Sequence, residues 1–369
     1  MKNVEDLVGA AVRDLADNAP RPLDLAAAAR TRGRRIRRRR RTAIGTAALA
    51  LTVVAAAPFV IVREQAPDSP ATPPPAPSMS ATTAAKGVWE QQPYQLPGGL
   101  VVTALTRIDV GSDNPAGKTL KDGNVALDRV TGRYWALPWD YYTIWGAPAG
   151  AGSLVSDGSS NLLSVGGEGV LPTPIPGGAE LPGPQWSRDG RRLLDTVHDG
   201  YVIRDGVTGR ITSRGGGGAT ATCPDFCYFT WLANGTEVAL PRVDPKVPQS
   251  EAKPDTIKDI VVYSIATGQR IRTLPVAGVP VDSDSWSPDG RFVMVFDQAF
   301  QTRPKHVVDV ETGKTVGRIP GTNVHFLPDG RILSIRDTKA EVYDVRGALV
   351  ESQTLPADFA GRTVSVGTL

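Results

Sequence analysis

Residue types that commonly carry catalysis or bind metals are scarce in this chain. Its 369 residues include two cysteines, three histidines and three methionines. His198, His306 and His325 are widely separated and lack the spacing of metal ligands, and the chain has no Gly-x-Ser-x-Gly motif of a serine hydrolase. The glycine run 215–218 lacks the Lys-Ser/Thr that follows a phosphate-binding loop. We therefore expect no catalytic residue, no metal and no cofactor.

Charge is absent from residues 43–62, a stretch of twenty residues. A helix of that length spans about 30 Å, which is the thickness of the hydrocarbon core of a membrane. A basic cluster, Arg34, Arg35 and Arg37 to Arg41, precedes this stretch. Because basic residues favour the cytoplasmic side, we predict a single transmembrane helix, 43–62, with the N-terminus in the cytoplasm and the rest of the chain outside. Membrane topology thus explains the arginines without a nucleic-acid partner.

A cleaved export signal is the alternative for this segment. Ala55 to Ala57 offer small residues at a plausible cleavage site, and consecutive arginines invite comparison with twin-Arg signals. Against cleavage, the leader of about 41 residues is long, and the apolar stretch continues through Phe59 to Val62. We favour an uncleaved anchor, and both alternatives place the bulk of the chain outside the cytoplasm.

The predicted cytoplasmic tail, residues 1–42, is basic and contains an amphipathic segment. Its first 41 residues hold twelve Lys/Arg and five Asp/Glu, whereas the whole chain has a net charge of +3. An isolated amphipathic helix is stable only when its apolar face is covered, so it docks on a partner or a membrane, or else the tail is weakly ordered. The composition resembles the tails of bacterial single-pass proteins associated with extracytoplasmic-function sigma factors. The partner-facing residues, at helical spacing, are Val4, Leu7, Val8, Val12 and Leu15.

Residues 63–94 form a predicted linker. The stretch 65–86 is rich in Pro, Ala, Ser and Thr and has no apolar periodicity, which predicts a disordered, semi-rigid spacer with polyproline character. At about 3.1 Å per residue such a spacer reaches up to about 70 Å from the bilayer.

From about residue 95 onwards the sequence repeats two kinds of hairpin. In the first kind, SWSPDGRFVMVF (285–296), Pro288 and Asp289 occupy the centre of a type I turn and Gly290 closes it. The aspartates at this position are expected to bond nearby backbone amides. In the second kind a short strand runs into Thr-Gly and a second strand follows. Further copies are QWSRDGRRLL, TWLANGTEVAL and HFLPDGRILSI of the first kind, and ALDRVTGRYW, VIRDGVTGRI, VYSIATGQRI and VVDVETGKTV of the second.

Two hairpins make a unit of four antiparallel strands, and the copies recur about every 43 residues, a spacing typical of propeller blades. We therefore predict an all-β domain at 95–369, a six-bladed β-propeller with four-stranded antiparallel blades. The predicted blades lie near residues 96–138, 139–178, 179–220, 221–278, 279–320 and 321–365.

The motifs resemble the TolB-like, WD-repeat-like propellers, whose repeat is W-S-P-D-G-[RK] followed by D-x-x-T-G. Trp286 to Arg291 match the first motif in full, and Asp309, Thr312 and Gly313 match the second. The resemblance covers roughly residues 95–360 and implies the fold. It implies no activity, because such propellers host binding modules and enzymes alike.

Cys223 and Cys227 are the only cysteines and lie in the segment CPDFC. In an oxidising compartment an even count favours a disulfide, here between Cys223 and Cys227. Its small loop makes the entropic stabilisation modest. A reactive pair and a metal site stay open as alternatives. A redox motif prefers two intervening residues and the start of a helix, and a metal site needs partners that the widely separated histidines do not supply.

Two segments are candidate contact surfaces. In RYWALPWDYYTIW (133–145) alternate aromatic residues are expected to pack inwards, which leaves Trp135 and Tyr142 as candidate binding residues. The polar, Pro-rich stretch 241–259 is predicted to be a long loop, either a contact surface or a tolerated insertion. His325 precedes the aromatic core position Phe326 and is expected to be a structural histidine on the other face of its strand.

These features predict a membrane-anchored, extracytoplasmic propeller that binds or senses a protein or cell-envelope ligand and is not an enzyme. One alternative is an enzyme with its site at the central channel, where residues of different blades meet. Another is a transmembrane regulator whose tail binds a sigma factor. Three or more carboxylates or histidines at the channel would favour the enzyme, and an apolar or aromatic rim would favour the binding module.

Overall fold

The computed structural model describes a set of ranges that all belong to one compact unit, Pro74–Leu369. None of the described helices is long and apolar enough to cross a membrane. The predicted tail helix, the predicted transmembrane segment 43–62, His198 and Cys223 lie outside the described residues. The described residues are 80–82, 89–107, 124–136, 143–150, 152–156, 161–165, 169–173, 183–197, 199–216, 227–248, 255–296, 304–321 and 323–369.

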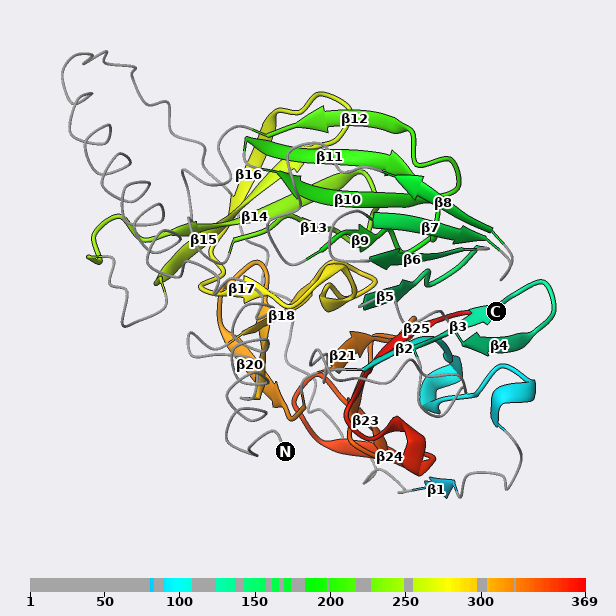
Figure 1. Cartoon of the computed structure of the whole chain (residues 1–369). Coiled ribbons are helices and arrows are strands. Elements are labelled where there is room, and N and C mark those ends of the chain that lie inside the picture. The colour runs from blue at the N-terminus through cyan, green and yellow to red at the C-terminus, as the bar shows by residue number, and fades with distance from the viewer. Residues whose placement is uncertain are drawn as a thin grey trace, which may run out of the picture. The chain divides into compact units, whose positions relative to one another are not determined.

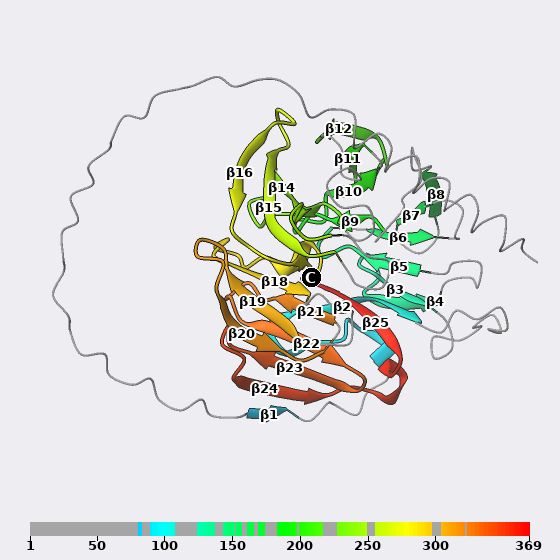
Figure 2. The same ribbon diagram turned by 90° about the vertical axis from the view of Figure 1, so that its left-hand side faces the viewer.

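The described strands form six sheets placed around a common centre, which is the arrangement of a β-propeller (Figures 1 and 2). Sheet I contains β25 (Arg362–Gly367), β2 (Val101–Arg107), β3 (Val125–Asp128) and β4 (Arg133–Ala136), and sheet II contains β5 (Thr143–Gly146), β6 (Gly152–Ser156), β7 (Asn161–Val165) and β8 (Gly169–Thr173). Sheet III contains β9 (Gln185–Trp186), β10 (Arg192–Val197), β11 (Gly200–Asp205) and β12 (Ile211–Gly215), and sheet IV contains β13 (Thr230–Trp231), β14 (Glu237–Val243), β15 (Ile257–Ser264) and β16 (Arg270–Leu274). Sheet V contains β17 (Val279–Pro280), β18 (Phe292–Phe296), β19 (Lys305–Asp309) and β20 (Thr315–Ile319), and sheet VI contains β21 (Asn323–Phe326), β22 (Ile332–Arg336), β23 (Lys339–Tyr343), β24 (Leu349–Thr354) and β1 (Ser80–Thr82).

The prediction of four-stranded antiparallel sheets is confirmed for five of the six. Sheet VI differs, because β1 pairs with β24 in parallel and adds a fifth strand at its outer edge. The residues of β1 come from the predicted linker 63–94. The prediction of disorder is therefore wrong for residues 80–82. Their backbone hydrogen bonds pair with the edge strand β24, whose outer side would otherwise be unpaired.

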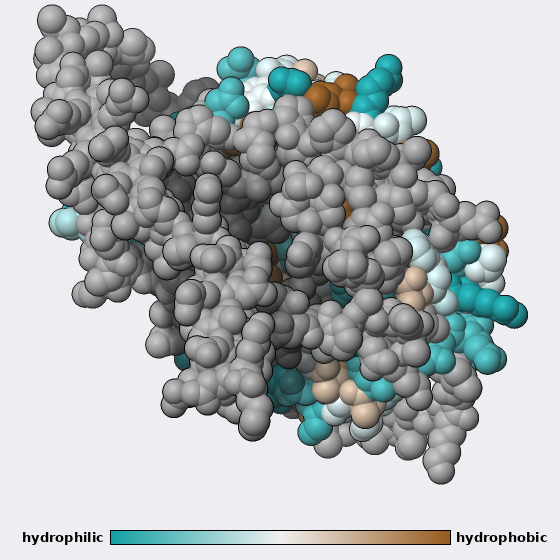
Figure 3. All heavy atoms as spheres, viewed as in Figure 1, coloured by the Kyte–Doolittle hydropathy of each residue, from teal (hydrophilic) through white to brown (hydrophobic). Residues whose placement is uncertain are grey.

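Strand position decides the pattern of burial. Middle strands such as β11 are buried at nearly every residue, because each sheet is packed between two others and both of its faces are covered. The outer strand β12 instead alternates exposed and half-buried residues. Large exposed apolar side chains are few and scattered among the described residues, and the coloured surface in Figure 3 is mostly teal and white.

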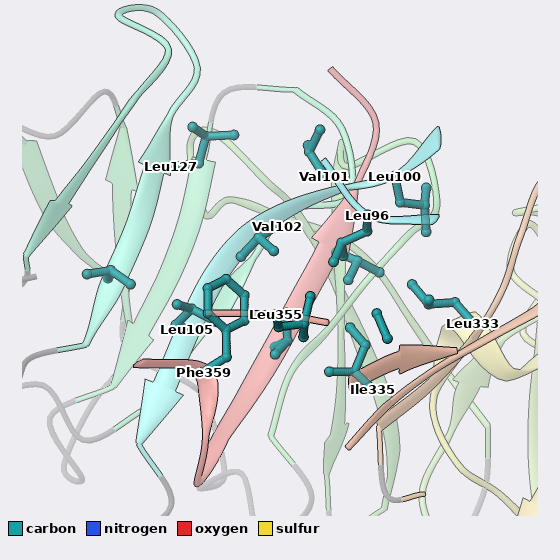
Figure 4. Close-up of a cluster of buried hydrophobic side chains, with 14 of the residues drawn as sticks. Leu96, Leu100, Val101, Val102, Leu105, Leu127, Leu333, Ile335, Leu355 and Phe359 are labelled. Carbon is teal, nitrogen blue, oxygen red and sulfur yellow. The ribbon is translucent and has the colours of Figure 1, made fainter. Parts of the chain in front are cut away.

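Successive sheets are joined by buried apolar clusters. Each of six clusters combines residues of two neighbouring sheets, and together they join sheet I to II, II to III, III to IV, IV to V, V to VI and VI back to I. The last of these closes the ring, and Figure 4 shows Val102 and Leu105 of β2 facing Leu333 and Ile335 of β22 across it. Two short 3-10 helices, η2 (Pro97–Gly99) and η4 (Ala357–Phe359), contribute Pro97 and Phe359 to the buried residues beside this contact.

Sheet I contains both ends of the propeller segment. Residues 362–367 form β25, which pairs antiparallel with β2. The expectation that the last blade runs through 321–365 is therefore wrong at its C-terminal end, because the final strand completes the first sheet. Arg129 strengthens this closure by donating to the carbonyl oxygens of Thr368 and Ala147, and the Thr368 N–H donates to the carbonyl of Pro148 over 2.7 Å.

In three of the four turns of the first kind, a tryptophan before the turn tethers its sheet to the preceding one. The indole N–H of Trp186 donates to the carbonyl oxygen of Trp145 over 2.9 Å, and that of Trp231 donates to Gln185 over 3.1 Å. The Trp286 indole donates to the hydroxyl of Thr230 over 3.0 Å. A buried indole N–H needs an acceptor, and the neighbouring inner strand supplies one each time.

Glycine in turns of the second kind allows a close approach between sheets. In the turn after β19, Asp309 accepts hydrogen bonds from the N–H and hydroxyl of Thr312, both at 2.9 Å. Gly313 follows with φ +68°, and a Cβ there would meet the carbonyl oxygen of Pro275, just after β16. The motif therefore serves contact between sheets V and IV as well as the turn itself.

The predicted loop 241–259 is shorter than expected. Strand β14 continues to Val243 and β15 begins at Ile257, so both ends of the segment are strand. Arg242 and Asp259 face each other across these strands and form a two-pronged ion pair at 2.8 and 2.6 Å. Paired charge and backbone hydrogen bonds extend the hairpin beyond the point where Pro241 suggests its end.

Alanine substitutions at Gly313 and Gly290 separate backbone strain from steric contact. Both glycines have left-handed φ, +68° and +71°, so either substitution strains the backbone by about 1 kcal/mol. Gly290 has no neighbouring atom within 4 Å of the added Cβ, whereas Gly313 would contact the Pro275 carbonyl. We expect Gly313→Ala to lower the free energy of unfolding by about 2 kcal/mol more than Gly290→Ala in urea titrations. Equal losses would show that this contact does not require glycine.

Candidate functional site

The structure describes one of the two candidate binding residues from the sequence. Trp135 of β4 is half-buried and packs against the apolar cluster between sheets I and II. Tyr142 lies outside the described residues. A binding role for this pair stays a prediction, and for Trp135 the structure shows packing.

Cys227 is half-buried beside β13 and packs against two apolar clusters of sheet IV. No cysteine among the described residues is a free thiol. Because Cys223 lies outside the described residues, its bond with Cys227 stays a prediction.

A polar cluster lies instead where the inner strand of sheet V is interrupted. After β17 the chain forms η3 (Ser283–Ser285), a single 3-10 turn that lies against β13, β18 and β21. Asp282 caps it by accepting a hydrogen bond from the N–H of Asp284 over 2.9 Å and one from the N–H of Ser285. The capping interactions explain why the chain turns here instead of continuing as a strand.

Ser283 connects η3 to two other sheets. Its hydroxyl donates to Oε1 of Gln185 on β9 over 2.6 Å and accepts from the backbone N–H of Trp231 on β13 over 3.2 Å. The amide of Gln185 in turn donates to the carbonyl of Phe229 over 3.1 Å. Sheets III, IV and V are thus hydrogen-bonded to one another through one serine.

His325 connects η3 to sheets VI and I. It is 6 % exposed, with Nδ1 3.2 Å from Oδ2 of Asp284 and Nε2 3.1 Å from Oδ1 of Asn323. The Nδ2 of Asn323 donates to the carbonyl of Val364 on β25 over 2.8 Å, which directs its Oδ1 towards the imidazole. Both ring nitrogens therefore face acceptors, and only the protonated imidazolium donates to both.

The environment changes the pKa values of two members of the cluster. Burial lowers the pKa of His325, but the hydrogen bond and charge of Asp284 and the charge of Asp282 outweigh it, so the pKa is raised above its ordinary value. Burial, and then the charge of Asp284, raise the pKa of Asp282 to about 7. Asp282 is therefore close to titration at neutral pH, and protonation of His325 is favoured relative to a free imidazole.

Lys305 and Tyr228 complete the surroundings of Asp282. Lys305 is fully buried, and its ammonium lies 4.4 Å from the centroid of the Phe296 ring. Burial lowers the pKa of Lys305 to about 8, partly offset by the charge of Asp282. Burial and then the charge of Asp282 raise the pKa of Tyr228, whose hydroxyl is 2.7 Å from the carbonyls of Pro280 and Val281.

The arrangement favours proton binding over nucleophilic chemistry. Two carboxylates and one histidine meet here, which reaches the number of such groups that would favour an enzyme with its site at the central channel. However, both nitrogens of His325 and the hydroxyl of Ser283 are already engaged with protein groups, whereas the Asp284 side chain is 29 % exposed. The described residues contain no group of His, Cys, Asp or Glu arranged to hold a metal ion.

Asp282 and Asp284 do not stand out among the sequence motifs, although a signal for them exists. Residues 281–285, VDSDS, occupy the place just before Trp286 where an apolar inner strand is expected. His325 lies on the face of β21 opposite to Val324 and Phe326, which pack between sheets V and VI. Its partners are Asp284 of η3, which is 41 residues away in sequence, and Asn323 of its own strand.

No family model matches the chain, and no curated protein matches it.

NMR titration of the full-length chain tests the environment of His325. With three histidines in the sequence, the imidazole signals can be resolved and assigned by substitution. We expect the pKa of His325 to lie above its ordinary value, and Asp284→Asn to lower it, because the hydrogen bond to a charged carboxylate is lost. Asp205→Asn, an exposed turn residue of sheet III, is the matched control and should leave it unchanged. A His325 pKa unaffected by Asp284→Asn would contradict the assigned pairing.

Proposed function

We propose that this chain is a membrane-anchored, extracytoplasmic propeller that binds or senses a protein or cell-envelope ligand. The closure of sheet I by β25 carries the proposal, because it places both ends of the propeller segment in one sheet. A ring closed in this way buries the apolar faces of all its sheets against one another, and the residues that precede it connect it to the predicted anchor. The uncharged stretch 43–62 and the preceding arginines support an anchor on that side.

We further propose that the chain is a six-bladed propeller of the TolB-like, WD-repeat-like kind. All six sheets act as blades of one propeller, with β1 an addition to the sixth. The likeness to TolB-like, WD-repeat-like propellers is supported by the hairpins that the W-S-P-D-G and D-x-x-T-G motifs form in sheet V. In both hairpins the motif aspartate accepts the hydrogen bonds expected of a turn residue.

A binding module is favoured over an enzyme by the state of the polar groups at the centre. Ser283, His325 and Asn323 are hydrogen-bonded to protein groups of neighbouring sheets, so they serve to hold the ring together. A catalytic base needs a lone pair directed at a substrate. An enzyme remains the second candidate, and the observation in its favour is the pKa of Asp282, about 7, beside the partly exposed Asp284.

The amphipathic segment of the tail suggests a regulatory partner in the cytoplasm. If residues 4–15 form a helix, their apolar face needs a cover, and a sigma factor is the partner that the composition of the tail suggests. The propeller would then sense a ligand outside while the tail holds the partner inside.

Cysteine labelling of intact cells tests the topology. Ser69→Cys in the linker should react with a membrane-impermeant maleimide added to intact cells, and Asn18→Cys in the tail should react only after lysis. The parent chain provides the background from Cys223 and Cys227. Loss of the tail from the mature protein would identify a cleaved signal, and labelling of Asn18→Cys in intact cells would overturn the proposed orientation.

Pull-down with the full-length chain in mild detergent tests the tail. We expect a specific cytoplasmic protein to be recovered, and Leu7→Asp to abolish its recovery by placing a charge on the apolar face. Arg13→Asp introduces the same side chain on the polar face and should leave recovery intact. Recovery unchanged by Leu7→Asp would rule out this binding mode.

A further inference from the structure

The turn η3 is an element of sheet V whose hydrogen bonds reach several other sheets. Through Ser283 it is bonded to β9 and β13, and through Asp284 it is bonded to His325 on β21. Asn323 extends the same series of hydrogen bonds to β25. The relative positions of the inner strands of sheets I, III, IV, V and VI therefore depend in part on one short turn.

The two hydrogen bonds of His325 require a proton on each ring nitrogen. Neutral imidazole has one N–H, whereas His325 faces an oxygen acceptor at each nitrogen. Asn323 cannot reverse its amide without losing the hydrogen bond to Val364, so loss of the proton breaks either the bond from β21 to Asp284 of η3 or the bond to Asn323 within β21. In both cases the positive charge that faces Asp284 across the two sheets is lost.

Loss of protons from His325 and Asp282 also makes the charges around η3 less favourable. With His325 protonated and Asp282 neutral, the charge of Asp284 is matched by the imidazolium. When both groups lose their protons, two carboxylates two residues apart remain in a largely buried setting, which is unfavourable. The other charged or titratable groups that face this turn are Lys305 and Tyr228 near Asp282 and Arg188, whose guanidinium donates to the carbonyl of Trp286 over 3.0 Å.

We propose that η3 is a proton-operated latch, held against β21 while His325 and Asp282 are protonated and released when they lose their protons. Release loosens the contact of sheet V with sheet VI at the centre of the ring, where η3 also holds sheets III and IV. In a compartment whose pH varies, the latch makes the arrangement of the inner strands depend on the pH of that compartment. This role is independent of the ligand and of the topology proposed above.

The direction of the stability change follows from the two pKa values that are raised in the folded state. Asp282, ordinarily near 4 and about 7 in the fold, stabilises the fold most below pH 4, and this contribution is lost as pH rises to 7. His325 has the same sign, with its contribution lost above its ordinary pKa of 6.5. Lys305, lowered to about 8 from 10.5, has the opposite sign, so its contribution returns as pH rises from 8 to 10.5.

Hydrogen exchange of the full-length chain in detergent tests the latch. Exchange is measured at pH 5.5 and pH 8 and corrected for the intrinsic pH dependence of amide exchange. We expect residues 279–296 and 323–327 to exchange at least about tenfold faster at pH 8, because the pKa of Asp282 is raised from 3.8 to about 7 and each unit titrated between the two pH values corresponds to a factor of ten. Residues 199–216 of sheet III should show no change and serve as the internal reference. Equal corrected protection at both pH values would overturn the proposal.

Asp282→Asn supplies the variant test. Asparagine keeps an oxygen that accepts the N–H groups of Asp284 and Ser285 but carries no charge, so it mimics the protonated state. We expect the difference in protection between pH 5.5 and pH 8 to become smaller in this variant, with the part that His325 contributes retained, whereas Asp205→Asn should behave like the parent chain. A pH response of Asp282→Asn equal to that of the parent would contradict the role of this carboxyl.

A second measurement covers the case in which the variant does not fold. The free energy of unfolding of the parent chain is measured by urea titration from pH 5 to pH 10. We expect it to fall towards pH 8 and to recover partly above it, following the three groups described above. A free energy of unfolding that rises steadily from pH 5 to pH 8 would overturn the proposal without any variant.

Discussion

Backbone hydrogen bonds between β2 and β25 join residues 101–107 to residues 362–367, the two ends of the propeller. Sheets II to V are each built from strands that follow one another in sequence, and sheet VI adds only the parallel strand β1 to four such strands. Closure lets sheets I and VI cover each other's apolar faces, as the cluster around Leu105 and Leu333 shows. Without it, both faces would meet water, at a cost of about 25 cal/mol for each Å² of apolar surface.

The repeated motifs act between sheets as much as within them. Trp186, Trp231 and Trp286 each donate an indole hydrogen bond to the preceding sheet. In sheet VI the corresponding residue is Phe326, which has no donor, and the contact with sheet V is apolar there. Loss of the indole donor in the last copy therefore follows from the neighbouring surface, since a donor without an acceptor would be unfavourable.

The centre of the ring departs from this regular scheme in sheet V. Regular inner strands satisfy their polar groups by pairing, whereas η3 satisfies its own with a cap and with side chains from other sheets. Buried charge of this kind contributes little net stability. The same arrangement ties the contact to the protonation of His325, and the proposed latch rests on this dependence.

The hairpins depend on interactions between residues close in sequence, so the sequence alone determined them. Turn residues such as Pro288, Asp289 and Gly290 act within a few residues of one another, so the hairpins and the propeller could be read from their spacing. The partner of β25, the parallel strand β1 and the meeting of Asp284 with His325 join residues far apart in the chain, and no local pattern encodes them. Only the closed ring brings these residues together, because each sheet's position depends on the packing of all the others.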